Sequence, residues 1–276
     1  MSLFRQLATA LGLACILVSC GSDDRPMVGD LETPRMLNAA AYQAKGIPAR
    51  FGDRSPHPWA EHHPALYPVH GVDAARYQGI MNWSAARSAG VRFAWLKATE
   101  GGNYIDPGFE KNADSARAAG VAVGAYHFYY FCRTPQEQAE WYIKRVPKRA
   151  GDLPPVLDIE WNHQSKTCRR FPDPQTVVSE MRTFLNIIER HYGTRPVIYT
   201  TVDFWHENHL TRLGNYDFWL RSVADHPKDR YPGVDWTFWQ YSGTGIVPGI
   251  GGTVDLNTFN GNQTTWARWY TSRKQR

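Results

Sequence analysis

Two carboxylic acids, Asp158 and Glu160, stand two positions apart at the end of the apolar run 155–160. Side chains two positions apart in a β-strand point to the same face, so both acids face one space while Ile159 faces the other. Crowding two acids in a partly dry pocket disfavours ionisation of both, so one keeps its proton near neutral pH while the other is charged. Glycoside hydrolysis needs that division, because an acid protonates the leaving oxygen while an anion attacks, activates water or stabilises the cationic sugar ring. A lone pair of this kind could also cap a helix or bind an arginine.

Other apolar runs also end in polar side chains. In an α/β barrel the C-terminal ends of the strands and the loops that follow them form one face, which carries the reactive groups. We therefore expect the strand-end residues to surround the two acids. Their presence favours a catalytic role for Asp158 and Glu160 over a capping role. These residues are Asp73, Lys97 with Glu100 just beyond it, His127, Tyr199, Gln240 and Asp255.

From His70 onward, apolar β-type runs alternate with helical segments. Strands are expected at 71–73, 91–98, 121–128, 155–160, 196–201, 216–222, 235–241 and 253–256. Helices are expected at 107–119, 135–146 and 174–191, where Pro follows a capping side chain at the first turn. Repeated β–α units indicate a parallel sheet, and the helices shorten after Thr201. About eight strands in one domain predict an α/β fold, a single irregular TIM-like (β/α) barrel with fewer helices in its second half.

The chain from His70 to about Trp269 resembles glycoside hydrolase family 25, the lysozymes that cleave peptidoglycan between N-acetylmuramic acid and N-acetylglucosamine. Two departures are Ala74-Ala75 after Asp73 and a basic loop at 161–171. Neither removes an expected catalytic group. The motifs that carry the resemblance are 71–73 with 78–79, 93–101, 106–107 with Asn112, 124–128, 155–160, 198–200, 239–242 and 254–257.

The resemblance implies a role for each acid. Glu160 would be the general acid, and Asp158 would stabilise the cationic transition state, either directly or by orienting the acetamido group of the substrate as an internal nucleophile. Asp73 and Asp255, from the first and last strands, would bind sugar hydroxyls or tune the pKa of the main pair. The expected substrate-binding residues are Tyr126, Tyr199, Trp239 and Gln240, with core packing as the alternative for the tyrosines, and the ion pair Lys97 and Glu100, which would order the site.

The resemblance also implies a glycan strand of peptidoglycan as the partner, with no cofactor and no metal. Two alternatives stay open: a peptidoglycan-binding lipoprotein of the same fold that does not cleave, and a hydrolase of chitin or another β-glycan. The chain carries 31 Lys and Arg against 26 Asp and Glu, a net charge of +5, but the basic residues are scattered. We therefore expect no nucleic-acid partner, and we expect a monomer.

Residues 1–19 are predicted to be a lipoprotein signal peptide, with Arg5 before an apolar stretch at 7–18 that is too short to span a bilayer. The string 17–21, Leu-Val-Ser-Cys-Gly, resembles a bacterial lipobox, which implies diacylation of Cys20. An ordinary cleaved signal and an uncleaved anchor are the alternatives. We expect an exported protein anchored through Cys20 to a bacterial membrane, and Ser22 after Gly21 favours the outer membrane over the inner one.

Residues 20–68 lack a sustained period and are predicted to be a tether, with a short helix possible around 34–45. His57, His62 and His63 have no suitably spaced Cys or acidic neighbours, so a solvated loop is favoured over a metal site. Residues 69–270 would form the barrel and 271–276 a basic tail. Beyond the signal peptide and Cys20 only Cys132 and Cys168 remain, which makes them candidates for a disulfide in an oxidising compartment.

Overall fold

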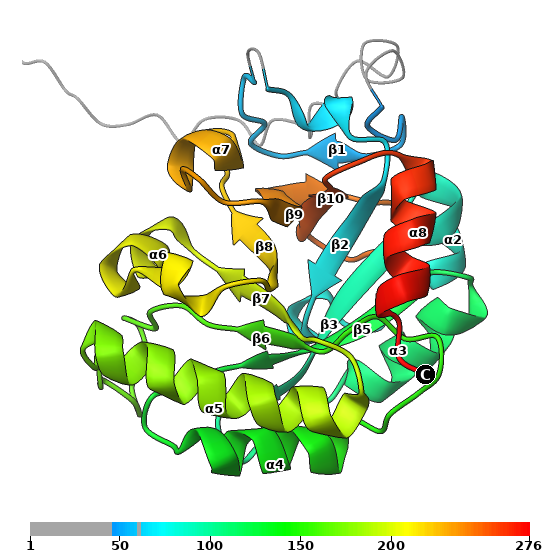
Figure 1. The fold of residues 1–276 in the computed structure, drawn as a ribbon. Helices are drawn as coiled ribbons and strands as arrows, with labels where there is room; N and C mark the ends of the chain where they lie inside the picture. The colour runs from blue at the N-terminus through cyan, green and yellow to red at the C-terminus, as the bar shows by residue number, and fades with distance from the viewer. Residues whose placement is uncertain (1–45, 60–61) are drawn as a thin grey trace, which may run out of the picture. The chain divides into compact units, whose positions relative to one another are not determined.

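A closed barrel of eight strands forms the centre of the computed structural model, which describes residues 46–59 and 62–276 (Figure 1). Neighbouring strands pair in the order β2-β3-β5-β6-β7-β8-β9-β10, and β10 pairs with β2 to close the ring. The pairs from β2 to β9 are parallel, whereas β10 is antiparallel to both of its neighbours. The strands are β2 (His70–Ala74), β3 (Phe93–Glu100), β5 (Ala122–Phe128), β6 (Val156–Asp158), β7 (Val197–Thr200), β8 (Asp217–Arg221), β9 (Trp236–Ile246) and β10 (Val254–Phe259). The predicted barrel is thus confirmed.

Large aromatic rings fill the interior of the barrel. Trp95 stacks on Trp219 with ring centroids 4.8 Å apart, and Phe238 meets Trp95 edge-on at 4.5 Å. Gly124 on the next strand leaves room for this filling, because a Cβ there would lie 2.4 Å from the indole nitrogen of Trp95. A packed interior of this kind confines any ligand to the mouth of the barrel, as in other α/β barrels.

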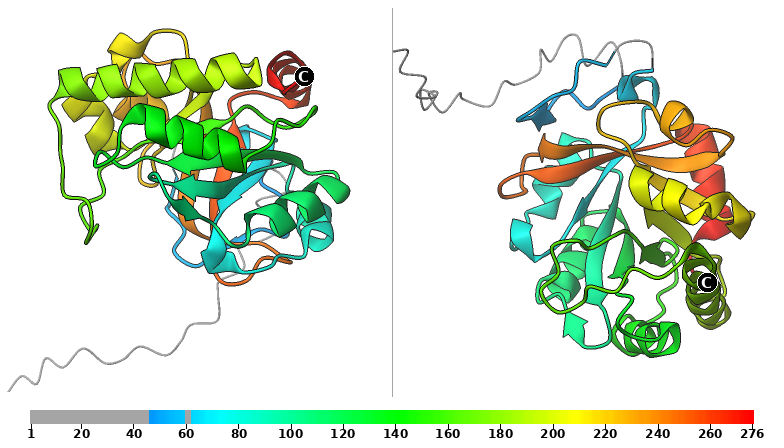
Figure 2. Two further views of the ribbon diagram at one scale, coloured as in Figure 1. Left: turned by 90° about the horizontal axis from the view of Figure 1, so that it is seen from below. Right: turned by 90° about the vertical axis from the view of Figure 1, so that its left-hand side faces the viewer.

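Helices cover the outside of the barrel and close its base. Helices α4 (Pro135–Arg145) and α5 (Pro174–Tyr192) lie side by side along one flank (Figures 1 and 2). At the base, Trp266 and Trp269 of α8 (Gln263–Arg273) pack against Phe238 and Phe259 inside the barrel. The other helices of the described chain are α2 (Trp83–Ala89), α3 (Phe109–Ala118), α6 (Val202–Asn208) and α7 (Pro227–Arg230), with 3₁₀ turns at Pro64–Leu66, Arg76–Gln78 and Leu210–Leu213.

The described part of the expected tether differs from a free linker. Strand β1 (Gly52–Asp53) pairs with the end of β9, and Ile47 and Phe51 are buried in the core. Trp59 meets Trp239 of β9 edge-on at 5.0 Å. Residues 46–59 and 62–68 therefore pack on the barrel. The sequence did not reveal this packing, because their apolar side chains occur singly among Pro, Arg and His residues and show no period.

The expected tail at 271–276 also packs on the domain. Helix α8 continues to Arg273, which forms an ion pair with Asp217, and Gln275 is buried against residues 149–153. A short strand missed by the sequence, β4 (Tyr104–Ile105), pairs with β3.

The predicted signal peptide at 1–19, the lipidation site Cys20 and the short helix around 34–45 lie outside the described residues. Within 46–59 and 62–276, no helix has the length and apolar character needed to cross a membrane.

Candidate active site

Strand β6 and the two residues directly after it bring Asp158 and Glu160 to the mouth of the barrel, as the alternation of a strand predicts. Asp158 is the last residue of β6, and the backbone N–H of Ile159 continues the pairing by donating to the carbonyl of Tyr199 at 3.0 Å. The Ile159 side chain is buried in the layer between barrel and helices. Asp158 and Glu160 both line the cavity at the mouth.

This cavity has a volume of about 830 Å³, enough for several sugar rings or a comparable ligand. It collects side chains from strands far apart in the sequence. Of the site residues predicted from the sequence, those that line the cavity are Asp73, Lys97, Glu100, Tyr126, Asp158, Glu160, Tyr199, Gln240 and Asp255. Of the residues expected around the two acids, Trp239 and His127 do not line the cavity.

Asp73 and Asp255 face one another across the seam where the barrel closes, as register partners of β2 and β10. Asp255 reaches the mouth from the beginning of its strand, not from the end as expected, because β10 runs antiparallel to its neighbours. One carboxylate oxygen of Asp73 accepts hydrogen bonds from the amides of Gln240, at 2.9 Å, and Asn257, at 2.7 Å. These two bonds fix Asp73 in the floor of the cavity.

The amides that hold Asp73 are fixed in turn by aromatic side chains. The phenol of Tyr199 donates to the carbonyl oxygen of the Gln240 side chain at 3.0 Å, and the indole of Trp219 donates to that of Asn257 at 2.7 Å. Each amide therefore presents its N–H₂ group to Asp73. A buried network whose members all have partners is rigid, so Asp73 is held before any ligand arrives.

Trp239 lies elsewhere. It is fully buried in the outer layer of the barrel, and its indole N–H donates to the carbonyl of Ser222 at 2.7 Å. Because neighbours in a strand face opposite sides, Gln240 points into the cavity and Trp239 points away from it. The expected role of Trp239 in sugar binding is therefore corrected to core packing.

His127, the polar residue at the end of β5, is also turned away from the cavity. It is buried, with its ring nitrogens 2.7 Å from the Thr99 hydroxyl and 3.1 Å from the side-chain oxygen of Gln138. Burial lowers the pKa of His127 to about 3, so the ring is neutral. It acts as a link between β3 and α4.

Lys97 and Glu100 form the expected ion pair at the edge of the cavity. The Lys97 ammonium also lies 4.6 Å from the centre of the Phe128 ring, a cation–π distance. Tyr126 is buried and lines the cavity next to this pair. The charge of Lys97 opposes the rise in the pKa of Asp158 and of Glu160, but burial has the larger effect on both.

The four acids at the mouth hold their protons more tightly than free carboxyl groups. Burial raises the pKa of Glu160 to about 7, although the positive charge of Arg221 opposes the rise. Burial, then the charge of Glu160, raises the pKa of Asp158 well above its usual value. Burial raises the pKa of Asp73 to about 6, against its two hydrogen bonds, and burial with the charge of Asp73 raises that of Asp255 to about 8. The site therefore carries shared protons near neutral pH.

Arg221, the last residue of β8, is a site residue that the sequence analysis missed. It lines the cavity, and its positive charge opposes the raised pKa values of Asp73, Glu160 and Asp255. Its position two residues after Trp219, within an expected strand, places it on the cavity side. Asn257 was also missed, although it belongs to the motif 254–257.

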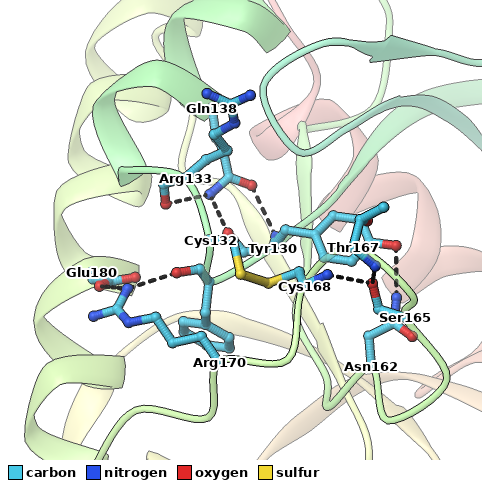
Figure 3. Close-up of a disulfide and its surroundings, with 11 residues drawn as sticks. Tyr130, Cys132, Arg133, Gln138, Asn162, Ser165, Thr167, Cys168, Arg170 and Glu180 are labelled. Carbon is cyan, nitrogen blue, oxygen red and sulfur yellow. Dashed lines mark hydrogen bonds and ion pairs between the residues drawn. A yellow bond between two sulfur atoms is a disulfide. The ribbon is translucent and has the colours of Figure 1, made fainter.

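A disulfide joins the loops that follow β5 and β6, and both loops contribute a side chain to the lining of the cavity. Cys132, after β5, is bonded to Cys168, in the loop after β6, with Cα atoms 5.7 Å apart (Figure 3). Next to it, the Asn162 amide donates to the Tyr130 hydroxyl at 2.7 Å, and both side chains line the cavity. Figure 3 shows this pair and the Ser165 turn around Cys168, so the cross-link joins the two loops that carry these side chains.

The model of the family described as "Glycosyl hydrolases family 25" matches residues 72–250. The chain belongs to this family. Lysozyme M1 of Streptomyces globisporus is 38% identical over 212 residues, which cover 70% of this chain and 68% of that protein. The Escherichia coli K12 protein YegX, described as uncharacterized, is 34% identical over 237 residues, covering 83% of this chain and 84% of its own.

Solved structures have the same barrel. A family 25 glycosyl hydrolase from Bacillus anthracis superposes with a TM-score of 0.69 at 34% identity, covering 78% of this chain and 99% of that one. The lysozyme from Streptomyces coelicolor gives a TM-score of 0.63 at 34% identity, covering 71% of this chain and 94% of its own.

Proposed function

We propose that this family 25 protein is a muramidase that hydrolyses the β-1,4 bond between N-acetylmuramic acid and N-acetylglucosamine in peptidoglycan. The single observation that supports this most is the pair Asp158 and Glu160 at the mouth of the barrel, with Glu160 partly protonated near pH 7. The names of relatives such as Lysozyme M1 support the substrate.

Glu160 is assigned the role of general acid. A carboxyl group with a pKa near 7 carries a proton at the pH where an ordinary glutamic acid has lost it. After it has donated this proton, it takes up another before the next turnover. The proton passes to the glycosidic oxygen as the bond to the anomeric carbon breaks, and water supplies the hydroxyl group of the new reducing end.

Asp158 is assigned the role of stabilising the positive sugar ring, which its ionised form performs while Glu160 holds the proton. One of its carboxylate oxygens is buried and has no hydrogen-bond partner among the described residues. A buried acceptor without a partner is costly, so a ligand that donates an N–H or O–H to it gains binding free energy. The acetamido N–H of an N-acetyl sugar is such a donor, which agrees with orientation of that group by Asp158. Asp73 and Asp255, beside this pair, are assigned to sugar hydroxyls and to tuning of its protons.

The test uses the protein beginning at residue 21, incubated with purified peptidoglycan. Mass spectrometry of the soluble products should show new reducing ends on N-acetylmuramic acid. Glu160→Gln, which keeps size and polarity but carries no transferable proton, is the matched control and should release none while still binding peptidoglycan in a pull-down assay. Absence of release by the wild-type protein, under conditions where a reference lysozyme cleaves, would contradict the proposal. Release of reducing ends from chitin oligosaccharides at an equal rate would indicate a broader β-glycan hydrolase.

We propose further that the protein is exported and lipid-anchored through Cys20, on the support of the lipobox-like string at 17–21. Metabolic labelling with a radioactive fatty acid should mark the wild-type protein and not Cys20→Ala. Equal labelling of both, or of neither, would contradict the anchor.

A further inference from the structure

A second pocket adjoins the cavity that holds Glu160. It has a volume of about 450 Å³ and is lined by residues 55–58, Arg221, Val223 and 241–244. Arg221 also lines the Glu160 cavity. The two spaces therefore share the Arg221 side chain, and a branched ligand that filled both would pass this residue.

One wall of this second pocket comes from residues 55–58, which precede the residues matched by the family model, 72–250. Asp53 holds this wall in place. Its buried carboxylate accepts from the Thr244 hydroxyl at 2.6 Å and from the backbone N–H of Ser55 at 2.9 Å. The Arg54 N–H adds a bond to the Thr244 carbonyl at 2.9 Å. The pairing of β1 with β9 and the two hydrogen bonds to Thr244 thus fix the wall before a ligand binds.

The far side of the wall is also anchored. The His57 ring lies 4.3 Å from the Trp59 ring, and Trp59 packs edge-on against the buried Trp239. His57 is half-buried and lines the pocket, so its imidazole has a defined place there.

The charged side chain that lines this pocket is that of Arg221, and no carboxylate is among the described residues that line it. His57 adds an imidazole ring to the lining. The nearby Asp53 is engaged with Ser55 and Thr244 and does not line the pocket. Guanidinium groups bind carboxylates through paired N–H donors, so the lining suits a ligand with carboxylate groups.

We propose that this pocket binds an acidic peptide branch of the glycan strand whose sugar backbone lies in the Glu160 cavity. The inference rests on the proposed function, because peptidoglycan carries such peptides on its muramic acid residues. A subsite of this kind makes the enzyme favour strands with peptide over bare strands.

The experiment compares two soluble substrates, uncross-linked peptidoglycan strands with their peptides and the same strands after an amidase has removed them. The readout is the ratio of kcat/KM for peptide-bearing to bare strands. His57→Glu places a negative charge in the pocket and should lower this ratio about tenfold, because like charges repel the peptide carboxylates. His57→Gln, of nearly the same shape and without charge, should lower it less than about threefold. Arg190→Glu, an exposed charge change on α5, should leave the ratio as in the wild type.

A wild-type ratio near one, or equal ratios in His57→Glu and His57→Gln, would overturn the proposal. Circular dichroism melts of each variant show that the folded state is being compared. If the proposed muramidase activity were itself wrong, the wild-type protein would cleave neither substrate, which is a different result from a ratio near one.

Discussion

Replacement of Asp255 by asparagine should make the protein more stable at alkaline pH. Asp255 faces Asp73 across the β10–β2 pair, and burial with the charge of Asp73 raises its pKa from 3.8 to about 8. The unfolded chain ionises this group from about pH 4 upward, whereas the folded protein keeps the proton until about pH 8. The folded state binds more protons over that window, so its stability falls as the pH rises through it. Asparagine has the same shape and no charge.

The size of the effect follows from the pKa shift. The difference between 3.8 and about 8 is roughly four units, which at about 1.4 kcal/mol per unit sets a ceiling of about 5 kcal/mol at pH 8. Since Asp73 shares the repulsion and also titrates in this range, one substitution should recover about 3 kcal/mol at pH 8 and almost nothing at pH 4.

Thermal unfolding at pH 4 and pH 8 measures this difference. A gain of about 3 kcal/mol corresponds to a rise in Tm of roughly 6–12 °C for a domain of this size. Asp217→Asn is the control, because Asp217 is paired with Arg273 and its loss should lower Tm at pH 8. A rise for Asp255→Asn that is equal at both pH values, or a fall at pH 8, would refute the electrostatic reasoning.

Three further results are expected. Glu160→Gln should lower kcat on peptidoglycan about 10³-fold, the scale of general acid catalysis, and a variant with more than a tenth of wild-type turnover would contradict the assignment. The wild-type kcat/KM should fall as pH rises through about 7, because Glu160 of the free enzyme then loses the proton it must donate; a kcat/KM that stays level to pH 9 would exclude Glu160 as the acid. In urea unfolding, the double variant Cys132→Ser, Cys168→Ser should lose about 3–4 kcal/mol of stability, because the unfolded chain is no longer closed into a loop by cysteines 36 residues apart. A loss under 1 kcal/mol would show that the two loops are held in place without the disulfide.

The barrel could be predicted because its strands are short apolar runs with regular spacing, and because the polar residues collect at their ends. The position of Asp158 and Glu160 on one face followed from the two-residue period of an extended chain, which is a local property of the backbone. The same period, applied to Gln240 and Trp239, would have excluded Trp239 from the cavity, since only one of two neighbours can face inward.

Other features depend on contacts that leave no local pattern. The reversed direction of β10 is set by its hairpin with β9, so Asp255 reaches the mouth from the start of its strand. Arg221 resembles any exposed arginine until the fold places it beside three acids. The packing of residues 46–59 and 62–68 rests on single side chains such as Phe51, which is buried, and Trp59, which meets Trp239 across more than a hundred residues of chain.

Residues 46–59 and 62–68 are packed parts of the domain and not a free tether. On the side of the barrel where β9 turns directly into β10, no helix of the described chain lies between these strands in sequence, and Phe51, Trp59 and Tyr67 pack against this side in place of one. A protein shortened to begin at residue 72, where the family match begins, would expose Trp239 and its aromatic neighbours to water. Exposed apolar patches of this kind drive aggregation. Soluble expression of the domain should therefore require a start no later than residue 46.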